Sequence, residues 1–516
     1  MVAKVHSVGL TGLSSFMVEV EADVAGTKFR FDLVGLPDAA VNEAKERVEA
    51  AIKNSGYAFP YGHITVNLAP ADVRKAGSVY DMPIFIALLI AIRQLKFDHE
   101  KTAFLGELSL SGEVRRVDGV LPMVIEARNA GMERIFIPAE NAKEASVVNG
   151  IQIFPVHTMR QLVGFLQNKP DAAPIAPTAP FDFAAARRSR RYLLDFADVK
   201  GQQGAKRALE VAAAGGHNIL MSGPPGSGKS MLAKRLPTIL PDLTFEEALE
   251  TTKIYSVAGA LDPEVGLITE RPFRSPHHTV SSAGLSGGGT VPKPGEISLA
   301  HNGVLFLDEL PEFTRSSMET MRQPIEDGKI TISRAAGSLT YPCAVMLVAA
   351  MNPCPCGYLG HPTKPCTCTP GAAQRYLSRV SGPLLDRIDI QIEVPPVEFD
   401  ELSSRERTEE PSAAIKARVD AARKIQQARF AGTGVTCNAK MTERQREEYC
   451  ALSEEGKRLL AGVFEKLGLS ARAYNKILKL ARTVADLDGA ENIALPHLSE
   501  AIRYRNLDRR MFLLHE

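Results

Sequence analysis

One segment has the residue types and spacing of a phosphate-binding loop. The match to G-x-x-x-x-G-K-[ST] is complete and consists of Gly223, Pro224, Pro225, Gly226, Ser227, Gly228, Lys229 and Ser230. An apolar stretch, 218–222, precedes it and a helix-forming stretch, 231–236, follows it. Glycines let backbone N–H groups converge on phosphates at the positive end of the following helix. We therefore expect Lys229 to reach the β and γ phosphates of ATP and Ser230 to coordinate Mg²⁺.

Two acidic residues, Asp308 and Glu309, directly follow the apolar stretch 304–307. Carboxylates at the end of such a strand lie in the crevice where an α/β sheet binds its ligand. The pattern predicts that Asp308 holds the Mg²⁺ shell and that Glu309 polarises the attacking water. Downstream of a complete phosphate-binding loop, it indicates ATP hydrolysis.

A third apolar stretch, 344–351, ends at Asn352. An amide in that position can orient the attacking water or contact the γ-phosphate. Taken alone, Asn352 is also compatible with a simple turn.

Four of the seven cysteines form two C-x-C pairs, at Cys354, Cys356, Cys366 and Cys368. Four thiolates can satisfy a tetrahedral Zn²⁺ ion, and a loop rich in proline and glycine has few other means of staying ordered. The C-x-C spacing is tighter than the usual C-x₂-C, so free cysteines and redox chemistry remain alternatives. Of these alternatives, the sequence favours a structural zinc site formed by the four cysteines.

The three strand-end motifs resemble those of the AAA+ ATPases, and among them the magnesium-chelatase-like branch, with Asn352 in the sensor-1 position. Residues 382–389 are similar to the arginine-finger motif of that family. The resemblance implies that Arg387 reaches the ATP of a neighbouring subunit, whereas the residues alone also allow a local ion pair. Residues 469–478 resemble the sensor-2 helix of that family, which implies that Arg472 contacts the γ-phosphate. The resemblance leaves open whether this is the nucleotide of its own subunit or of a neighbour.

The segment 352–357, together with 274–278 and 294–303, resembles the bacterial YifB/ComM family over essentially the whole chain. The resemblance implies a homohexameric, cytoplasmic ring motor that acts on single-stranded or branched DNA. Such a helicase or branch-migration factor would promote DNA integration during natural transformation or recombination. The alternatives are a chelatase-type motor that drives metal insertion or remodels a protein partner, and an ATP-dependent peptidase.

The peptidase alternative comes from 106–113 and 131–141, which resemble the proteolytic domain of Lon. Lon-type peptidases need a serine nucleophile and a lysine base. In this alignment Asp81 falls near the nucleophile position and Leu121 near the lysine position, while Lys75 and Ser78 are out of register. We therefore expect a non-proteolytic domain that oligomerises or guides the substrate.

These motifs require several domains to position them, and 516 residues suffice for about three. Apolar alternation predicts strands at 64–68 and 134–138, and helical patterns occupy 42–52 and 83–95. The expected fold is multidomain α/β. Its predicted parts are a Lon-like (ribosomal S5-type) α/β domain, 1–168; a Pro/Ala-rich basic linker, 169–191; an AAA+ P-loop α/β core with chelatase-like insertions and the cysteine loop, 192–396; and an all-helical lid of the chelatase C-terminal type, 397–516.

A hairpin in the core offers a contact surface for a polymer. Asp327-Gly328 predicts a turn before the alternating strand 329–334, and Gly337 predicts the next turn. Lys329 and Arg334 are candidates to contact a DNA backbone, although a solvated hairpin has the same pattern. The net charge is only +1, so we expect a basic channel that forms when subunits assemble.

The sequence shows no secretory signal pattern near its start. The longest apolar run, 82–92, is too short to span a bilayer and predicts a buried helix. We therefore expect a cytoplasmic protein without a membrane partner. Reduced thiols in that compartment favour metal binding over disulfides.

Overall fold

The computed structural model describes residues 2–188, 192–289, 292–334, 337–397 and 409–505. The chain forms two compact units. One contains the chain up to residue 189 together with 245–269, and the other contains 190–244 and the chain from residue 270 onward. Within the described ranges, every helix is too short or too polar to cross a membrane.

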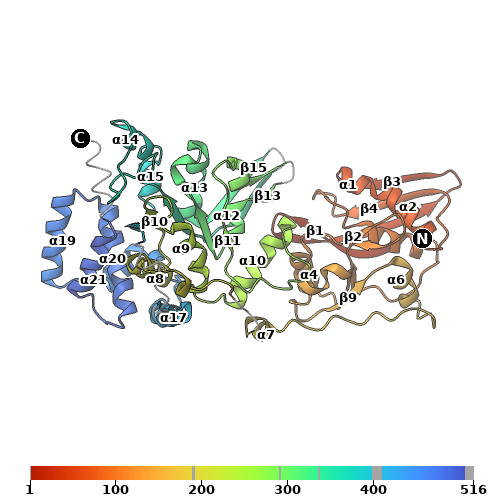
Figure 1. The fold of residues 1–516 in the computed structure, drawn as a ribbon. Helices are drawn as coiled ribbons and strands as arrows, with labels where there is room; N and C mark the ends of the chain where they lie inside the picture. The colour runs from red at the N-terminus through yellow and green to blue at the C-terminus, as the bar shows by residue number, and fades with distance from the viewer. Residues whose placement is uncertain (1, 189–191, 290–291, 335–336, 398–408, 506–516) are drawn as a thin grey trace. The chain divides into compact units, whose positions relative to one another are not determined.

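The N-terminal unit is built on a seven-stranded mixed sheet of order β3-β4-β2-β1-β5-β8-β9 (Figure 1). Its strands are β1 (Ala3–Thr11), β2 (Ser14–Ala25), β3 (Arg30–Val34), β4 (His63–Ala69), β5 (Thr102–Phe104), β8 (Arg134–Pro138) and β9 (Gln152–Val156). Its longer helices are α2 (Ala44–Asn54), α3 (Asp81–Ala91), α4 (Val120–Asn129), α6 (Met159–Leu166) and α10 (Phe245–Ala258). The predicted strands at 64–68 and 134–138 are confirmed as β4 and β8.

The core of this unit centres on α3, which is buried from Asp81 to Leu89 and packs on β1, β2 and α2. A helix that is apolar on all sides must be covered on all sides. The apolar run 82–92 is therefore a core helix, as its length predicted.

The Pro/Ala-rich segment packs along the N-terminal unit, although its composition suggested a free linker. The backbone N–H of Thr178 donates to the carbonyl of Ile153 at 2.8 Å, and that of Phe181 donates to Ser146 at 3.0 Å. Ile175 is buried. A short helix, α7 (Phe183–Arg188), follows. Residues 189–191, at the end of the predicted linker, lie outside the described residues.

Residues 245–269 also belong to the N-terminal unit, although they lie within the range 192–396 predicted for the ATPase core. Helix α10 packs on α4, and the N–H of Gly119 donates to the carbonyl of Ser256 at 3.0 Å. Tertiary contacts of this kind leave no periodic signal in the sequence.

The second unit contains a five-stranded parallel sheet of order β11-β14-β17-β10-β18. Its strands are β10 (Ile219–Ser222), β11 (Phe273–Arg274), β14 (Val304–Leu307), β17 (Met346–Met351) and β18 (Ile390–Glu393). Strands β10, β14 and β17 are buried at every residue, as expected for a parallel sheet covered on both faces. Helices α8 (Gln203–Gly215) and α9 (Lys229–Arg235) flank β10 in the chain.

Two hairpins extend from this core. Strands β15 (Lys329–Arg334) and β16 (Gly337–Pro342) pair in the register that joins Lys329 to Pro342, which confirms the predicted hairpin. The predicted turn at Asp327-Gly328 is instead the end of helix α13 (Arg315–Asp327), because Gly328 caps it in the left-handed conformation (φ +65°). The second hairpin pairs β12 (Gly287–Gly288) with β13 (Lys293–Pro294).

The C-terminal part of this unit is helical, as predicted. Its helices are α17 (Ser412–Arg429), α18 (Glu443–Tyr449), α19 (Glu454–Leu467), α20 (Ala471–Leu487) and α21 (Leu495–Arg503). Ser453 and Ser470 cap the N-termini of α19 and α20 through their hydroxyls. Helix α20 packs on α8, α17 and α21, so these helices share the apolar core beside the sheet. The fold is thus multidomain α/β with a C-terminal helical region.

Candidate functional site

The predicted phosphate-binding loop connects β10 to α9. Gly226 (φ +78°) and Gly228 (φ +90°) have the left-handed backbone conformation. That conformation is unfavourable for any residue that carries a Cβ atom. A Cβ atom at Gly223 would collide with the carbonyl of Val394. The glycines of the motif are therefore required by the path of the backbone itself.

Lys229 begins α9 and its ammonium group lies over the loop. Nζ donates to the carbonyls of Gly223 at 2.7 Å and Pro224 at 2.9 Å, and it lies 3.3 Å from Oδ1 of Asn352. Burial lowers the pKa of Lys229, while the charges of Asp308 and Glu309 oppose that shift. The first and third predicted motifs therefore meet at one ammonium group.

Ser230 and Asp308 lie beside this lysine. The Ser230 hydroxyl donates to Oδ2 of Asp308 at 2.6 Å. The contact is possible because β10, β17 and β14 are adjacent parallel strands whose carboxyl ends share one edge. A hydroxyl next to a carboxylate is a hard-oxygen donor pair that fits Mg²⁺.

Glu309 has a left-handed backbone (φ +53°), and its N–H donates to Oδ1 of Asp308 at 3.0 Å. Its carboxylate oxygen Oε2 lies 3.3 Å from Nδ1 of His278. Sequence patterns do not predict this pair, because His278 and Glu309 lie on separate segments of the chain. The strand order could have revealed it, since His278 and Glu309 each follow one of the neighbouring strands β11 and β14.

Arg387 and Arg472 line a different cavity, of about 660 Å³. Arg387 forms an ion pair with Glu326 and donates to the carbonyl of Pro383 at 2.7 Å. Arg472 lies 3.4 Å from Asp386 and is largely exposed. In the described part of the chain, the cavity is lined by residues outside the phosphate-binding loop. The structure thus brings the two arginines together and separates them from Lys229.

A half-buried polar cluster, in which His217 is fully buried, connects this cavity to the start of β10. Asp389 accepts from Nδ1 of His217 at 3.2 Å and forms an ion pair with Lys476 at 3.1 Å. Nε2 of His217 lies 2.8 Å from the hydroxyl of Thr483 on α20. Although burial acts against ionisation, Lys476 and His217 lower the pKa of Asp389. Helix α20, which carries Arg472, is therefore attached to the sheet by charged contacts.

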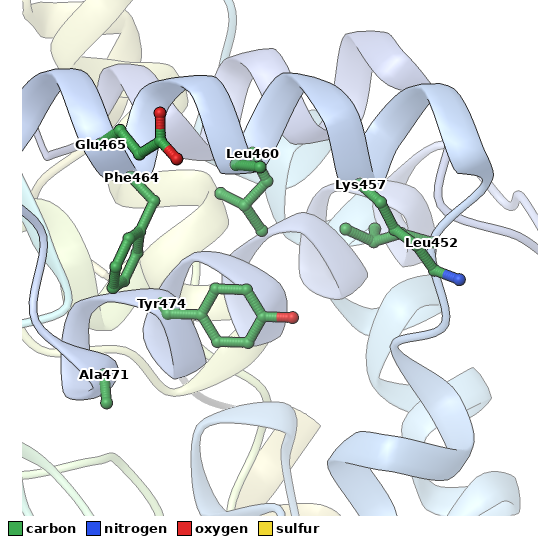
Figure 2. Close-up of a pocket in the computed structure, with 8 residues that line it drawn as sticks. Leu452, Lys457, Leu460, Phe464, Glu465, Ala471 and Tyr474 are labelled. Atoms are coloured by element: carbon green, nitrogen blue, oxygen red, sulfur yellow. The ribbon is translucent and has the colours of Figure 1, made fainter.

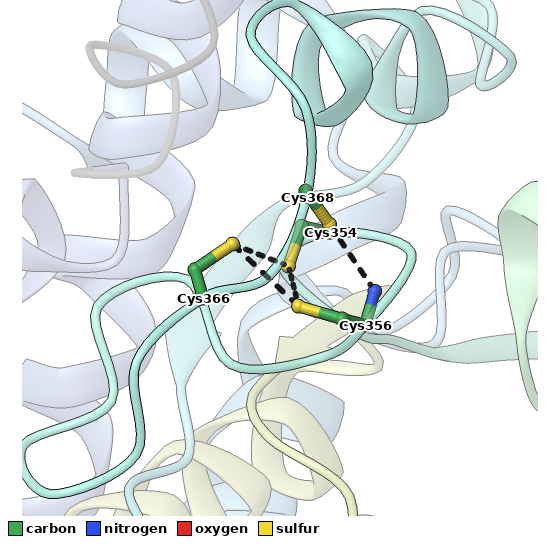
Figure 3. A group of neighbouring side chains, drawn as sticks. All are labelled: Cys354, Cys356, Cys366 and Cys368. Atoms are coloured by element: carbon green, nitrogen blue, oxygen red, sulfur yellow. Dashed lines mark hydrogen bonds between the residues drawn. The ribbon is translucent and has the colours of Figure 1, made fainter.

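The four predicted cysteine ligands lie together (Figure 3), with all four sulfurs within 4.8 Å of one another. Sγ of Cys354 is 3.4 Å from that of Cys356 and 3.7 Å from that of Cys366. Tetrahedral Zn–S bonds of about 2.3 Å separate sulfurs by about 3.8 Å. Backbone hydrogen bonds, first from Tyr358, lower the pKa of Cys356, whereas burial and the neighbouring thiols raise the pKa values of Cys366 and Cys368. The thiol set fits a zinc ion.

The cysteine loop also contacts the phosphate-binding loop. Gly357 has a left-handed backbone (φ +83°), and a Cβ atom there would lie 2.5 Å from Cδ of Pro225. The cysteine loop also starts directly after Asn352. It therefore adjoins both the phosphate-binding loop and the strand end that carries Asn352. Cys343, Cys437 and Cys450 are buried elsewhere as free thiols.

A further hollow, of about 440 Å³, lies between α19 and α20 (Figure 2). Phe464 and Tyr474 face each other edge-on across it, with ring centroids 6.4 Å apart. Its one lining ammonium group, on Lys457, pairs with Glu454 at 2.8 Å. The hollow is mainly apolar and has no arrangement of groups suited to catalysis.

In the N-terminal unit, the positions aligned with the Lon dyad have other roles. Asp81 is buried and accepts from Nε of Arg47 at 2.6 Å, and Leu121 is buried in α4. The Ser78 hydroxyl donates to Glu107, and the Lys75 ammonium donates to the carbonyls of Pro70 and Val73. Lys75 and Ser78 are thus each engaged with other partners.

Of the two DNA-contact candidates, Lys329 is exposed at the start of β15. Arg334 ends the same strand opposite Gly337, and its side chain lies outside what the structure describes.

Comparison with known proteins adds to this geometry. The family "Magnesium chelatase, subunit ChlI" matches residues 195–402, "Subunit ChlI of Mg-chelatase" matches 20–141, and "Magnesium chelatase, subunit ChlI C-terminal" matches 409–505. Lon protease 2 of Bacillus subtilis is 29% identical over 153 residues, which cover 27% of this chain and 26% of that protein.

Two relatives match over nearly their full length. The protein YifB of Salmonella typhimurium is 43% identical over 517 residues, covering 100% of this chain and 99% of that protein. The competence protein ComM of Haemophilus influenzae is 44% identical over 511 residues, covering 98% of each. The chain belongs to the YifB/ComM family of magnesium-chelatase-like AAA+ proteins.

Proposed function

We propose that this protein hydrolyses ATP and uses the energy to move on DNA as a ring of identical subunits. The observation that carries the ATPase proposal is the convergence of three separate motifs. Lys229 contacts Asn352, and Ser230 contacts Asp308, at one edge of the parallel sheet.

The residues divide the chemistry among them. Lys229 and the backbone N–H groups of the loop bind the phosphates, while Ser230 and Asp308 hold Mg²⁺. Bound Mg²⁺ supplies positive charge that neutralises the β and γ phosphate oxygens. Glu309 accepts a proton from the attacking water, and Asn352 orients that water.

Arg387 and Arg472 serve the nucleotide of a neighbouring subunit in this proposal. Both line the 660 Å³ cavity, away from the phosphate-binding loop of their own chain. A cation supplied by a neighbouring subunit stabilises the negative charge that develops on the phosphate oxygens in the transition state. The shared cavity thus supports action in trans for Arg472 as well as for Arg387, in a hexameric ring.

The DNA substrate is supported by two features. The exposed Lys329 lies on a hairpin that extends from the ATPase core, and a ring repeats this charge in every subunit. Similarity to a protein named for competence favours a role in DNA integration during natural transformation or recombination. The motor would act there as a helicase or branch-migration factor in the cytoplasm.

The decisive experiment incubates purified protein with ATP, Mg²⁺ and a forked or three-stranded DNA and measures strand displacement. We expect displacement that requires ATP hydrolysis and that the Lys229→Ala variant lacks. If the protein neither displaces a strand nor hydrolyses ATP faster with DNA, the DNA proposal fails. Hydrolysis without any DNA effect would leave the ATPase proposal standing alone.

A chelatase-type motor that drives metal insertion or remodels a protein partner is the second candidate. The three chelatase family matches favour it. It predicts ATP hydrolysis that a protein partner stimulates and DNA does not, so the same ATPase assay separates the two. An ATP-dependent peptidase is disfavoured by the Asp81–Arg47 ion pair at the aligned nucleophile position.

A structural zinc ion in the cysteine loop completes the proposal. The four sulfurs have the chemistry and the spacing for it, and the loop contacts Pro225 of the phosphate-binding loop. The ion would keep this irregular segment folded beside Asn352.

A further inference from the structure

One asparagine, Asn218, joins the two nucleotide-binding strands to the segment that carries Arg387. It lies directly before β10, the strand that leads into the phosphate-binding loop. Its amide oxygen Oδ1 accepts from the backbone N–H of Leu347 on β17 at 2.8 Å. Strand β17 ends directly before Asn352. Asn218 therefore connects the amino ends of the two strands whose carboxyl ends carry the phosphate-binding loop and Asn352.

The other half of the same amide holds the backbone of Arg387. Nδ2 of Asn218 donates to the carbonyl of Arg387 at 3.1 Å. The backbone carbonyl of Asn218 accepts from the N–H groups of Asp389 and Ile390, each at 3.0 Å. Because the peptide unit is planar, holding the carbonyl of Arg387 also fixes the Cα atom from which its side chain starts.

The guanidinium of Arg387 is only partly satisfied by its own chain. It forms an ion pair with Glu326 and donates to the carbonyl of Pro383 at 2.7 Å. Its Nε is buried and has no hydrogen-bond partner among the described residues. A buried donor without a partner costs free energy, so the local contacts do not fully account for this side chain. The guanidinium keeps an N–H group for an acceptor from outside the chain.

The next carbonyl along the chain, that of Ile388, is held from the helical region. It accepts from Nζ of Lys476 on α20 at 3.0 Å and from the guanidinium of Arg505 at 2.7 Å. Both of these donors are charged, and Lys476 also pairs with Asp389. The contact from Asn218 is neutral and comes from the nucleotide-binding strands. Its removal therefore changes the support of Arg387 without leaving an unpaired charge.

We propose that Asn218 is a positioning residue that sets the place from which Arg387 serves the nucleotide of the neighbouring subunit. The arginine of each subunit is thereby positioned by the strands that bind the nucleotide of that same subunit. This inference rests on the proposed function, in which Arg387 acts in trans, and it adds the residue that holds Arg387 in place.

The test measures ATP hydrolysis by full-length protein carrying Asn218→Asp or Asn218→Ala. Asn218→Asp keeps an acceptor for Leu347 and loses the donor to Arg387, whereas Asn218→Ala loses both. The two variants share the loss of the donor, so a slower rate in both assigns the effect to the carbonyl of Arg387. We expect each rate to fall about fivefold, the order of one neutral hydrogen bond. Binding of a fluorescent ATP analogue should stay at the wild-type level, because Lys229 keeps its contacts.

Two further measurements separate the positioning of Arg387 from general damage to the fold. On the Arg387→Ala background, adding Asn218→Ala should leave the single-turnover rate unchanged, because the group that Asn218 positions is already absent. Mixing Asn218→Ala with Lys229→Ala subunits should raise the rate per Asn218→Ala subunit, because the Lys229→Ala chains supply correctly held arginines. Subunits with a damaged phosphate-binding loop gain nothing from such mixing.

Asn54→Asp is the matched control. Nδ2 of Asn54 donates to the carbonyl of Leu110 at 2.7 Å in the N-terminal unit, so this variant loses the same kind of hydrogen bond. We expect wild-type hydrolysis from it.

Wild-type rates from both Asn218 variants, or losses from Asn218→Ala and Arg387→Ala that multiply in the double variant, would overturn the inference. So would a failure of Lys229→Ala to rescue Asn218→Ala when it rescues Arg387→Ala. In each case a slow Arg387→Ala protein leaves the proposed function standing. An Arg387→Ala protein with the wild-type rate would contradict the proposed role of Arg387 itself, and the inference would fail with it.

Discussion

The hydroxyl of Ser230 lies 2.6 Å from Oδ2 of Asp308, which joins the first turn of α9 to the end of β14. The two residues are far apart in the sequence, and β17 lies between their strands in the sheet. The contact exists because parallel strands deliver their following residues to one edge. Substitutions of residues at this edge of the sheet therefore test the predicted chemistry of the protein.

Replacing Glu309 by Gln should abolish hydrolysis and preserve ATP binding. The amide keeps the shape of the side chain but cannot take a proton from water, a loss of about 10²–10⁴-fold in rate. Phosphate release and binding of a fluorescent ATP analogue measure the two properties separately. Glu312→Gln, at an exposed carboxylate that pairs with Arg379, is the control and should hydrolyse ATP normally.

Mixing inactive subunits should show that Arg387 acts on a neighbour. The variants Arg387→Ala and Lys229→Ala should each lose ATP hydrolysis, by about 10³-fold for the arginine. Mixed rings should regain part of the activity, because some interfaces combine an intact phosphate-binding loop with an intact arginine. Absence of any recovery would place Arg387 on its own subunit's nucleotide.

Arg472→Ala should behave as Arg387→Ala does in the same mixing assay, because both side chains line one cavity. The exposed lid residue Arg444 provides the control: Arg444→Ala should leave the hydrolysis rate unchanged. If Arg472→Ala is inactive and mixing does not rescue it although Arg387→Ala is rescued, Arg472 acts in cis.

The variant Cys354→Ser/Cys356→Ser should lose bound zinc, because two of four sulfur ligands are removed. Elemental analysis of the purified protein measures the metal content, and the melting temperature should fall with it. Cys343→Ser should retain wild-type zinc, since Cys343 lies outside the cluster and its burial raises the pKa of the thiol to about 12. Unchanged zinc in the double variant would remove the metal proposal.

Acidification should destabilise the second unit through His217. Burial lowers the pKa of His217 in the folded protein, although Asp389 opposes the shift. A lowered folded-state pKa contributes stability that is complete above the unfolded value of about 6.5 and is lost as pH falls below it. The urea midpoint should therefore decrease from pH 7.5 to pH 5.5, and His217→Gln should flatten that decrease. An equal slope in the variant would contradict this assignment.

Local sequence patterns predicted helices and strands well where an amphipathic face or a capping residue sets the limits of the element. Helices α19 and α20 lie within the region 397–516 that was predicted to be helical, and serine caps and amphipathic spacing define their ends. The turn predicted at Gly328 proved to be a helix cap instead. Both structures use a glycine at positive φ, so the residue type alone does not distinguish them.

The sequence by itself determined that the chain carries a complete G-x-x-x-x-G-K-[ST] loop, carboxylates at a strand end and two C-x-C pairs. The reason is that consecutive residues of a loop or strand end stay close in any fold, so spacing is enough. Only the tertiary structure decided which separate segments meet. It joined Glu309 to His278, placed Arg472 with Arg387, and packed 245–269 in the N-terminal unit. Those contacts depend on strand order and on packing between distant segments, for which a single sequence carries no periodic signal.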